Sequence, residues 1–362
     1  MSDTTSMLSS GRQATYVRPN SRWGKQLGKL ALAGTLALFA LSLLAVYLMP
    51  LGYALVASLR VRNPPADAPI WPMSPATFTW EGREVEIFRV PTADGERELA
   101  IIDKGRTASQ FVDPQNPAEV IDWQGAWRTL PRVYFWDPQW QNFSEVWRFL
   151  DFGRLLFNTI IIALIGTVGT VLSCTAVAYA FARFRLPGKA IFFVLLMGTI
   201  ILPSEVTLIP TYIIFYQLGW VGTWLPLIVP HFFANAWNVF LLRQFIMGIP
   251  RELDEAAMID GANPLQTLLR IIMPQALPAM VAVALFHFFF AWNDFFLPLI
   301  YLAGKPEMYT ISVAMQTFQV QYGGRPELTM TASLMATVLP FILFFLGQRF
   351  FMQGVVVTGV EK

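Results

Sequence analysis

Residues 250–278 read PRELDEAAMIDGANPLQTLLRIIMPQALP, a polar stretch between two long apolar segments. Three acids, Glu252, Asp254 and Glu255, stand together near its start, where the positive end of a helix dipole favours them. Gly261 follows, and glycine takes the left-handed conformation that ends a helix at no steric cost. The stretch therefore predicts a short first helix that begins just after Pro250 and ends at Gly261.

A second short helix is predicted directly after this bend. Asn263 is a good helix cap and Pro264 suits a first helical turn. Apolar side chains then recur at helical spacing, and Pro274 is expected to interrupt the helix. These apolar residues are Leu265, Leu268, Leu269 and Ile272.

The first helix is predicted to present a face of small side chains. Leu253, Ala256, Ala257 and Asp260 recur at spacings of three and four, which places them on one side of a helix. Such a shallow face lets another surface approach closely. From periodicity alone, an ordinary amphipathic connector remains an equally good interpretation.

The spacing of residues in this stretch resembles the EAA loop of the membrane subunits of binding-protein-dependent ABC importers. In that family the loop docks into a groove on the cytoplasmic ATPase. The resemblance implies that Glu255 holds the loop in this groove, that the two alanines permit close approach, and that Gly261 sets the bend. The family usually has Leu where Met273 stands, a change of little volume or polarity. The ATPase-coupling residues implied are Glu255, Ala256, Ala257, Asp260, Gly261, Ile271 and Pro274.

The composition predicts a membrane protein. Hydrophobic residues make up 55% of the 362 residues and charged residues only 14%, with a formal net charge of +2. This near-neutral balance gives no reason to expect nucleic-acid binding. Cys174 is the only cysteine, so disulfide scaffolds and cysteine-based metal sites are excluded.

Six segments are apolar enough and long enough to cross a bilayer, which needs about 20 residues. The third contains Pro203 and Pro210, so we expect a kink there. Gly166 and Gly169 give the second segment a small face for helix packing. The predicted spans are Leu30–Leu55, Leu156–Ala182, Ala190–Phe215, Gly222–Phe245, Leu277–Leu302 and Thr329–Gln348. The predicted fold is an all-α polytopic membrane protein, and the resemblance implies the type I permease architecture of ABC importers.

The basic residues of the short loops predict the orientation. With six spans, most of them fall on the same side as the N-terminal tail and residues 250–278, which makes that side cytoplasmic. Both termini are then inside, and a bacterial cytoplasmic (inner) membrane is expected. The domains are predicted as a tail (1–29), a first helix (30–59), an external insert (60–154), a five-helix permease core (155–349) and a C-terminal tail (350–362).

The external insert is predicted to hold a small β domain. Residues 77–80, 84–90 and 98–103 have the pattern of short strands, and Gly82 and Asp94-Gly95 are the expected turns. Its tryptophans are expected to fill the core of this domain and to anchor it at the membrane interface; contact with an external solute-binding protein is the alternative. They include Trp123, Trp127, Trp136, Trp140 and Trp147.

Two acids lie inside predicted spans, where a charge facing lipid is costly. Glu205 and Asp294 are each expected near the outer end of the membrane, either emerging into water or lining a polar cavity. With Trp292 and Asn293 they are the candidate translocation-path residues, because sugar recognition needs aromatic faces and planar polar groups. His287 has no second ligand at metal spacing, so no metal site is expected.

Toward the C terminus, several motifs are similar to the smaller membrane subunit of maltose-type carbohydrate importers. The resemblance covers the first span and most of residues 151–362; the insert is longer than usual in that class. It implies a sugar importer permease with two ATPase subunits, a second homologous membrane subunit, an external solute-binding protein and surrounding lipid. It also implies that the C-terminal tail reaches into the ATPase dimer; a frayed terminus is the alternative. The motifs are Trp292-Asn293-Asp294, residues 310–316, residues 348–354 and residues 358–362.

No phosphate-binding loop is present: each of the Gly-Lys pairs lacks the upstream glycine spacing and the following Ser or Thr. We therefore expect no enzymatic activity and no cofactor in this chain, with ATP bound by partner subunits. Two alternatives remain. One is a secondary transporter or channel working without an ATPase, which predicts broken spans in matching halves. The other is a membrane anchor whose external domain does the work, although the insert offers no hydrolytic set of residues.

Overall fold

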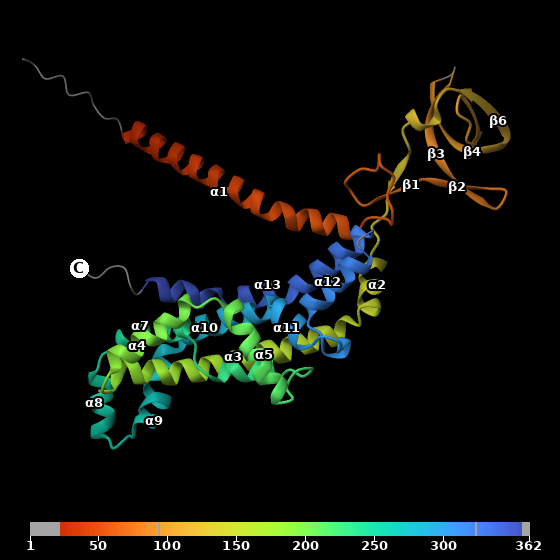
Figure 1. The fold of residues 1–362 in the computed structure, drawn as a ribbon. Helices are drawn as coiled ribbons and strands as arrows, with labels where there is room; N and C mark the ends of the chain where they lie inside the picture. Colours follow the sequence, from red (N-terminus) through yellow and green to blue (C-terminus); the bar gives the residue numbers. More distant parts are fainter. Residues whose placement is uncertain (1–21, 93–94, 323, 357–362) are drawn as a thin grey trace, which may run out of the picture. The chain divides into compact units, whose positions relative to one another are not determined.

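The computed structural model describes residues 22–92, 95–322 and 324–356 (Figure 1). It divides into two compact units, residues 1–53 and residues 54–362. Helix α1 (Arg22–Ser58) begins inside the segment that was predicted to be a tail. The first part of the predicted tail, residues 1–21, lies outside the described residues.

The insert contains a five-stranded antiparallel sheet in which each strand pairs with the next along the chain. Its strands are β2 (Thr77–Trp80), β3 (Arg83–Thr92), β4 (Gly95–Asp103), β5 (Ala108–Asp113) and β6 (Asn116–Gln124). Before and after this sheet in sequence, β1 (Met73–Pro75) pairs with β7 (Tyr134–Trp136), and a 3-10 turn η1 (Trp127–Thr129) lies between β6 and β7.

The sheet confirms the predicted small β domain and extends it. The three predicted strands are present, and Gly82 turns the chain with φ +78°; Asp94 lies outside the described residues. The sequence reasoning missed β5 and β6. Pro117 in β6 argues against a strand, but β6 is the edge strand of the sheet, where the missing N–H of proline is tolerated.

The tryptophans of the insert divide into two groups. Trp123 and Trp127 pack against buried Phe111 and Phe88, with ring centroids 6.2 Å and 6.0 Å apart. The prediction of a core role is therefore confirmed for these two. The other three are exposed by 49% or more: they are Trp136, Trp140 and Trp147.

The remaining chain is helical. Its first part has α2 (Gln141–Phe149), α3 (Phe152–Arg183), α4 (Lys189–Gly198), η2 (Thr199–Ile201), α5 (Ser204–Gln217), α6 (Leu225–Ile228), η3 (Val229–Phe232) and α7 (Ala236–Met247). Its second part has α8 (Glu252–Ile259), α9 (Pro264–Thr267), η4 (Leu268–Ile272), α10 (Met273–Asn293), α11 (Phe296–Tyr301), η5 (Pro306–Met308), α12 (Ile311–Tyr322) and α13 (Pro326–Val356).

Four helical segments are long and apolar enough to cross a membrane, or up to six if each of two bent pairs counts as one span. The four are Lys29–Ser58, Phe152–Arg183, Leu225–Met247 and Pro326–Arg349. The expectation of six spans, the third of them kinked, is therefore met only if each bent pair counts as one span. The kink expected in the third span is a 100° bend between Lys189–Ile201 and Glu205–Gln217, at Pro203.

The fifth span also differs from the prediction. Its helix ends at Asn293 instead of continuing to Leu302, because the backbone of Asp294 is extended (ψ 119°), and the short α11 follows. At the other end of the chain, α13 continues to Val356, beyond the predicted end at Gln348. The predicted C-terminal tail is thus helical at its start, and residues 357–362 lie outside the described part.

Helix α3 lies at the centre of the helical bundle, where α7 and α10 pack against it. A buried cluster joins these three helices through Cys174 and Ala178 of α3, Val239 of α7 and Val283 of α10. The predicted small face of α3 is confirmed at Gly169, where an added Cβ would stand 2.7 Å from a ring carbon of Phe232. This packing carries α8 and α9 at the end of the bundle opposite α2 (Figure 1).

Candidate functional site

Helix α8 forms and ends as the sequence predicts. Its first turn holds the three predicted acids. Gly261 has φ +79°, the amide of Gly261 donates to the carbonyl of Met258 (3.1 Å), and the amide of Ala262 donates to the carbonyl of Ala257 (2.9 Å). This pair of bonds is the Schellman motif, which satisfies carbonyls that the helix end would otherwise leave unpaired.

Helix α9 starts at a capping box. The side-chain oxygen of Asn263 accepts from the amide of Gln266, and that of Gln266 accepts from the amide of Asn263, each at 2.9 Å. The predicted cap at Asn263 and first turn at Pro264 are confirmed. The Gln266 partner was missed, although Asn-x-x-Gln before an apolar run has the spacing of this motif.

The expected interruption at Pro274 is wrong. The chain stays helical through a π-helical turn (η4), and Pro274 lies in α10 directly after it. The bend comes one turn later, 81° between Pro264–Gln275 and Leu277–Asn293. Pro278 explains it, because it cannot donate to the carbonyl of Pro274 and its ring pushes that carbonyl away.

The structure separates the residues that the sequence placed on one face of α8. Ala257 is 3% exposed and, with Asp254, forms the inner face of the helix. Ala257 is therefore not on the approachable surface, which corrects the predicted small face. The other predicted coupling residues lie differently: Glu255, Ala256, Asp260, Gly261 and Pro274 are exposed, and Ile271 is half-buried.

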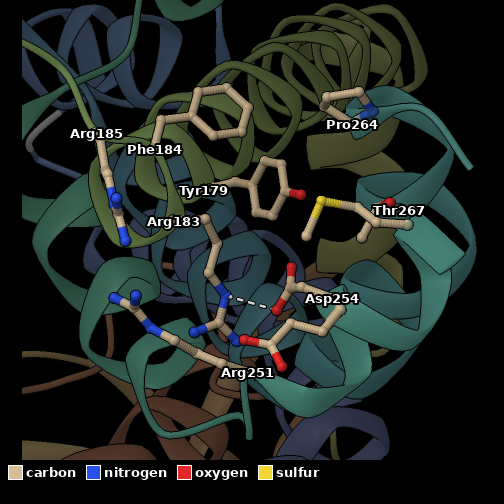
Figure 2. Close-up of a pocket in the computed structure, with 10 residues that line it drawn as sticks. Tyr179, Arg183, Phe184, Arg185, Arg251, Asp254, Pro264 and Thr267 are labelled. Atoms are coloured by element: carbon tan, nitrogen blue, oxygen red, sulfur yellow. Dashed lines mark ion pairs between the residues drawn. The ribbon is translucent and has the colours of Figure 1, made fainter.

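An ion pair fixes the inner face of α8 to the end of α3 (Figure 2). Nε of Arg183 lies 3.0 Å from Oδ2 of Asp254, and the two side chains are only 7% and 12% exposed. Nη2 of Arg183 also donates to the carbonyl of Ile249 at 2.8 Å, just before α8. The guanidinium therefore holds both the helix and the chain leading into it.

A pocket of about 310 Å³ surrounds this ion pair. Side chains from α3, α8 and α9 and their flanking residues line it, and Figure 2 shows Tyr179 and Thr267 both above the ion pair. Arg185, Arg251 and Glu255 add further charge to its wall. The pocket thus lies between the helical hairpin and the end of the bundle.

The outer side of the hairpin carries an exposed apolar surface that the sequence reasoning missed. Ile259 is 87% exposed at the end of α8, beside Met258 (63%). Leu265 (62%) of α9 and Leu269 (52%) of η4 are also exposed. Met258 additionally lines the pocket on the inner side. We call Ile259, Leu265 and Leu269 the hairpin surface. An exposed apolar group of this kind marks a contact site for a partner.

The four residues predicted for a translocation path do not gather in one place. Trp292 is 5% exposed and stacks on Phe288 at 5.7 Å, so it belongs to the core. Asn293 is exposed and donates to the carbonyl of Phe289 within its own helix (2.8 Å). Glu205 is exposed in the first turn of α5, and Asp294 lines a cavity of about 200 Å³. The path assignment stays a prediction.

Asp294 also has a structural role. One of its carboxylate oxygens accepts from the amide of Leu297 at 3.3 Å, and its carbonyl accepts from the hydroxyl of Ser312 at 2.6 Å. The residue therefore caps α11 and joins it to α12.

A pair of histidines was missed by sequence reasoning. His231 of η3 lies against His287 of α10, with ring centroids 4.4 Å apart, although 55 residues separate them in the chain. Among the residues that the structure describes, no group of three or more His, Cys, Asp or Glu could hold a metal ion.

Comparison with known families identifies the class of protein. The family described as binding-protein-dependent transport system inner membrane component matches residues 169–357, which is more than half of the chain and includes the hairpin. This chain belongs to that family. It is a multi-pass inner-membrane permease component, with the hairpin of α8 and α9 inside the matched region.

Individual relatives agree with this class. The osmoprotective compounds uptake permease protein GgtD of Synechocystis sp. is 30% identical over 66% of this chain and 80% of its own length. The arabinooligosaccharides transport system permease protein AraQ of Halalkalibacterium halodurans is 31% identical over 56% of this chain and 72% of its own length. The sn-glycerol-3-phosphate transport system permease protein UgpE of Yersinia enterocolitica is 31% identical over 60% of this chain and 79% of its own length.

A solved structure shows the same fold. It is a crystal structure of a bacterial ABC transporter involved in the import of the acidic polysaccharide alginate. One chain of it aligns with a TM-score of 0.60 at 20% identity, over 91% of this chain and 98% of that one. The type I permease fold is thereby shown.

Proposed function

We propose that this chain is the permease subunit of an ATP-driven, binding-protein-dependent sugar importer. It would work with two ATPase subunits, a second homologous membrane subunit and an external solute-binding protein. Curated relatives named for arabinooligosaccharide and alpha-glucoside transport support a carbohydrate solute. Other relatives are named for osmoprotective compounds and for glycerol-3-phosphate, so the family also includes permeases named for other solutes.

The observation that carries this proposal is the hairpin surface. Two short helices leave Ile259 87% exposed at the end of the bundle, while the Arg183–Asp254 ion pair fixes their inner side. Such a rigid hairpin with an apolar outer side can transmit force from a partner to the spans. ATP-driven closure of the ATPase dimer would move the hairpin, and with it α3 and α10, as rigid bodies.

The chain's own residues then divide the work. Gly261 and Asn263 hold the bend, and the exposed Glu255 and Ala256 are available to an ATPase groove. ATP hydrolysis takes place in the partner subunits, since this sequence has no phosphate-binding loop. The hairpin and both termini face the cytoplasm, as the distribution of basic residues predicts.

A secondary transporter without an ATPase is the alternative. It predicts broken spans in matching halves, and the structure does contain a second bent pair, Pro264–Gln275 with Leu277–Asn293. That bend, however, lies in the first turns of α10, directly after the hairpin. Membership of a binding-protein-dependent family argues against this alternative.

Cysteine cross-linking tests the docking role. We would place single cysteines at Ile259 and Ala256, which are exposed, and at Ala257, which is buried, in a Cys174→Ser background of the complete importer. We expect the first two to cross-link to the ATPase subunit during active transport and the third to remain unreacted. Equal yields at all three positions, or none at Ile259, would contradict the proposal.

A functional test complements it. Glu255→Lys and Gly261→Pro should uncouple ATP hydrolysis from transport while membrane insertion survives. Full transport by both variants would show that the hairpin does not couple.

A further inference from the structure

A pocket that opens on the surface of the helical part combines groups that recognise uncharged sugars. It has a volume of about 620 Å³ and lies between the η3–α7 segment and α10. His231, Asn235 and Asn238 line it from the first segment, and His287 lines it from α10. Three aromatic rings complete the wall: Trp237, Phe286 and Phe290. The volume falls in the range of small-molecule sites.

The pocket lies at mid-depth of two spans. His287 is ten residues, or about 15 Å at helical rise, from Leu277, where the segment of α10 after the bend begins. His231 and Asn238 lie within the span Leu225–Met247. Polar side chains at such depth face the interior of a bundle or a water-filled path, because lipid cannot satisfy them.

Two of these polar side chains are deeply buried and carry an atom without a hydrogen-bond partner in the described part of the chain. His287 is 5% exposed and its Nε2 is unpartnered; Asn238 is 7% exposed and its Oδ1 is unpartnered. Native proteins rarely bury polar atoms unpaired. Neither atom is accessible from the pocket, and Nε2 of His287 faces Gly166 of α3. The polar side chains that a solute can reach there are those of the exposed Asn235 and the half-buried His231.

Close packing gives the histidines their place. A Cβ added at Gly166 of α3 would stand 3.0 Å from His231 and 3.2 Å from Nε2 of His287. A larger residue at this position would be tight against both imidazoles, so the pair lies directly against the central helix.

The charge of the pocket distinguishes between solute classes. None of its lining residues is Lys, Arg, Asp or Glu. Recognition of a carboxylate or phosphate uses Arg or Lys, which form charge-assisted bonds to these groups. In addition, Asp294 lines the neighbouring cavity that shares His231 and Phe290, and its carboxylate would repel an anion.

We infer that this chain contacts the solute itself, at the pocket of His231, Asn235 and Trp237, and that the solute is an uncharged sugar. The inference rests on the proposed function and adds the solute class and the contact residues. The names of the relatives leave the charge open, because one is named for an arabinooligosaccharide and another for a phosphate ester.

The first test measures uptake of labelled sugars by cells that lack their own sugar importers and express the complete importer. The uncharged probes are maltose, sucrose, cellobiose and arabinobiose; the anionic probes are glucuronate, digalacturonate and glucose 6-phosphate. We expect uptake only among the uncharged probes. ATPase-dependent uptake of an anionic probe would overturn the inference and leave the importer function intact. Uptake of no probe would count against the sugar importer proposal itself.

The second test compares two exposed aromatic residues of the same segment. Trp237 (62% exposed) lines this pocket, whereas Phe233 (73% exposed) lines a different hollow on α3 and α4. For Trp237→Ala we expect the maximal uptake rate to fall about ten-fold, with the amount of assembled complex in the membrane kept. Phe233→Ala should stay within about two-fold of the unmodified protein. Equal effects of the two variants, or no effect of Trp237→Ala, would overturn the contact role.

Discussion

Removing one partner of the Arg183–Asp254 ion pair should release α8 from the bundle. The pair is 3.0 Å apart, and its side chains are 7% and 12% exposed. Loss of one partner leaves a buried charge uncompensated, which costs about 3–5 kcal/mol. For Asp254→Asn we therefore expect the ratio of docked to released α8 to fall by roughly two to three and a half orders of magnitude.

Amide hydrogen exchange of residues 252–260, in the purified protein in lipid nanodiscs, measures this ratio. Exchange reports local opening, so the protection of α8 should fall by the same factor while that of buried α3 amides is kept. Glu252→Gln is the matched control, because it removes an exposed acid from the same first turn. Its loss of helix-dipole interaction is only about 0.3–1 kcal/mol.

A double variant separates the effect of an unpaired buried charge from the effect of losing the contact between the two side chains. Arg183→Met with Asp254→Leu removes both charges and keeps side chains of similar volume, and such replacements are often neutral. We expect it to recover most of the protection that Asp254→Asn loses. If the amides of α8 are as well protected from exchange in Asp254→Asn as in Glu252→Gln, the ion pair does not hold α8 and the reasoning is refuted.

Three further predictions concern local geometry. Gly261→Ala should lower stability by about 1–2 kcal/mol, because φ is +79° although no atom lies within 4 Å of an added Cβ. Gly169→Ala should cost about 1–3 kcal/mol through overpacking, since its Cβ would stand 2.7 Å from a phenyl ring. Gly34→Ala, with open space and no positive φ, is the control for both and should show no loss of thermal stability; a loss as large as theirs would contradict the two assignments. Finally, replacing residues 77–132 by Asn-Gly should leave a protein that inserts into the membrane and assembles. The amide of Ala76 already donates to the carbonyl of Val133 at 2.8 Å, so a two-residue turn can join them. Aggregation of this variant in gel filtration would contradict the prediction.

The sequence by itself determined the features that depend on neighbours within about one helical turn. The Schellman end at Gly261 and the cap at Asn263 are built from bonds that reach no more than five residues along the chain. Apolar length predicts which segments can cross a membrane, and β3 and β4 follow from local alternation and a turn. These elements could be predicted because their stabilising contacts lie inside the segment that was read.

Only the tertiary structure decided which side of each element faces inward. Ala257 was predicted on the outer face, but the pairing of Asp254 with Arg183, 71 residues earlier, turns that side toward the bundle. Likewise, His231 meets His287 because both helices pack on Gly166 of α3. Periodicity shows that a helix has two sides, whereas the buried partner that chooses between them comes from a distant part of the chain.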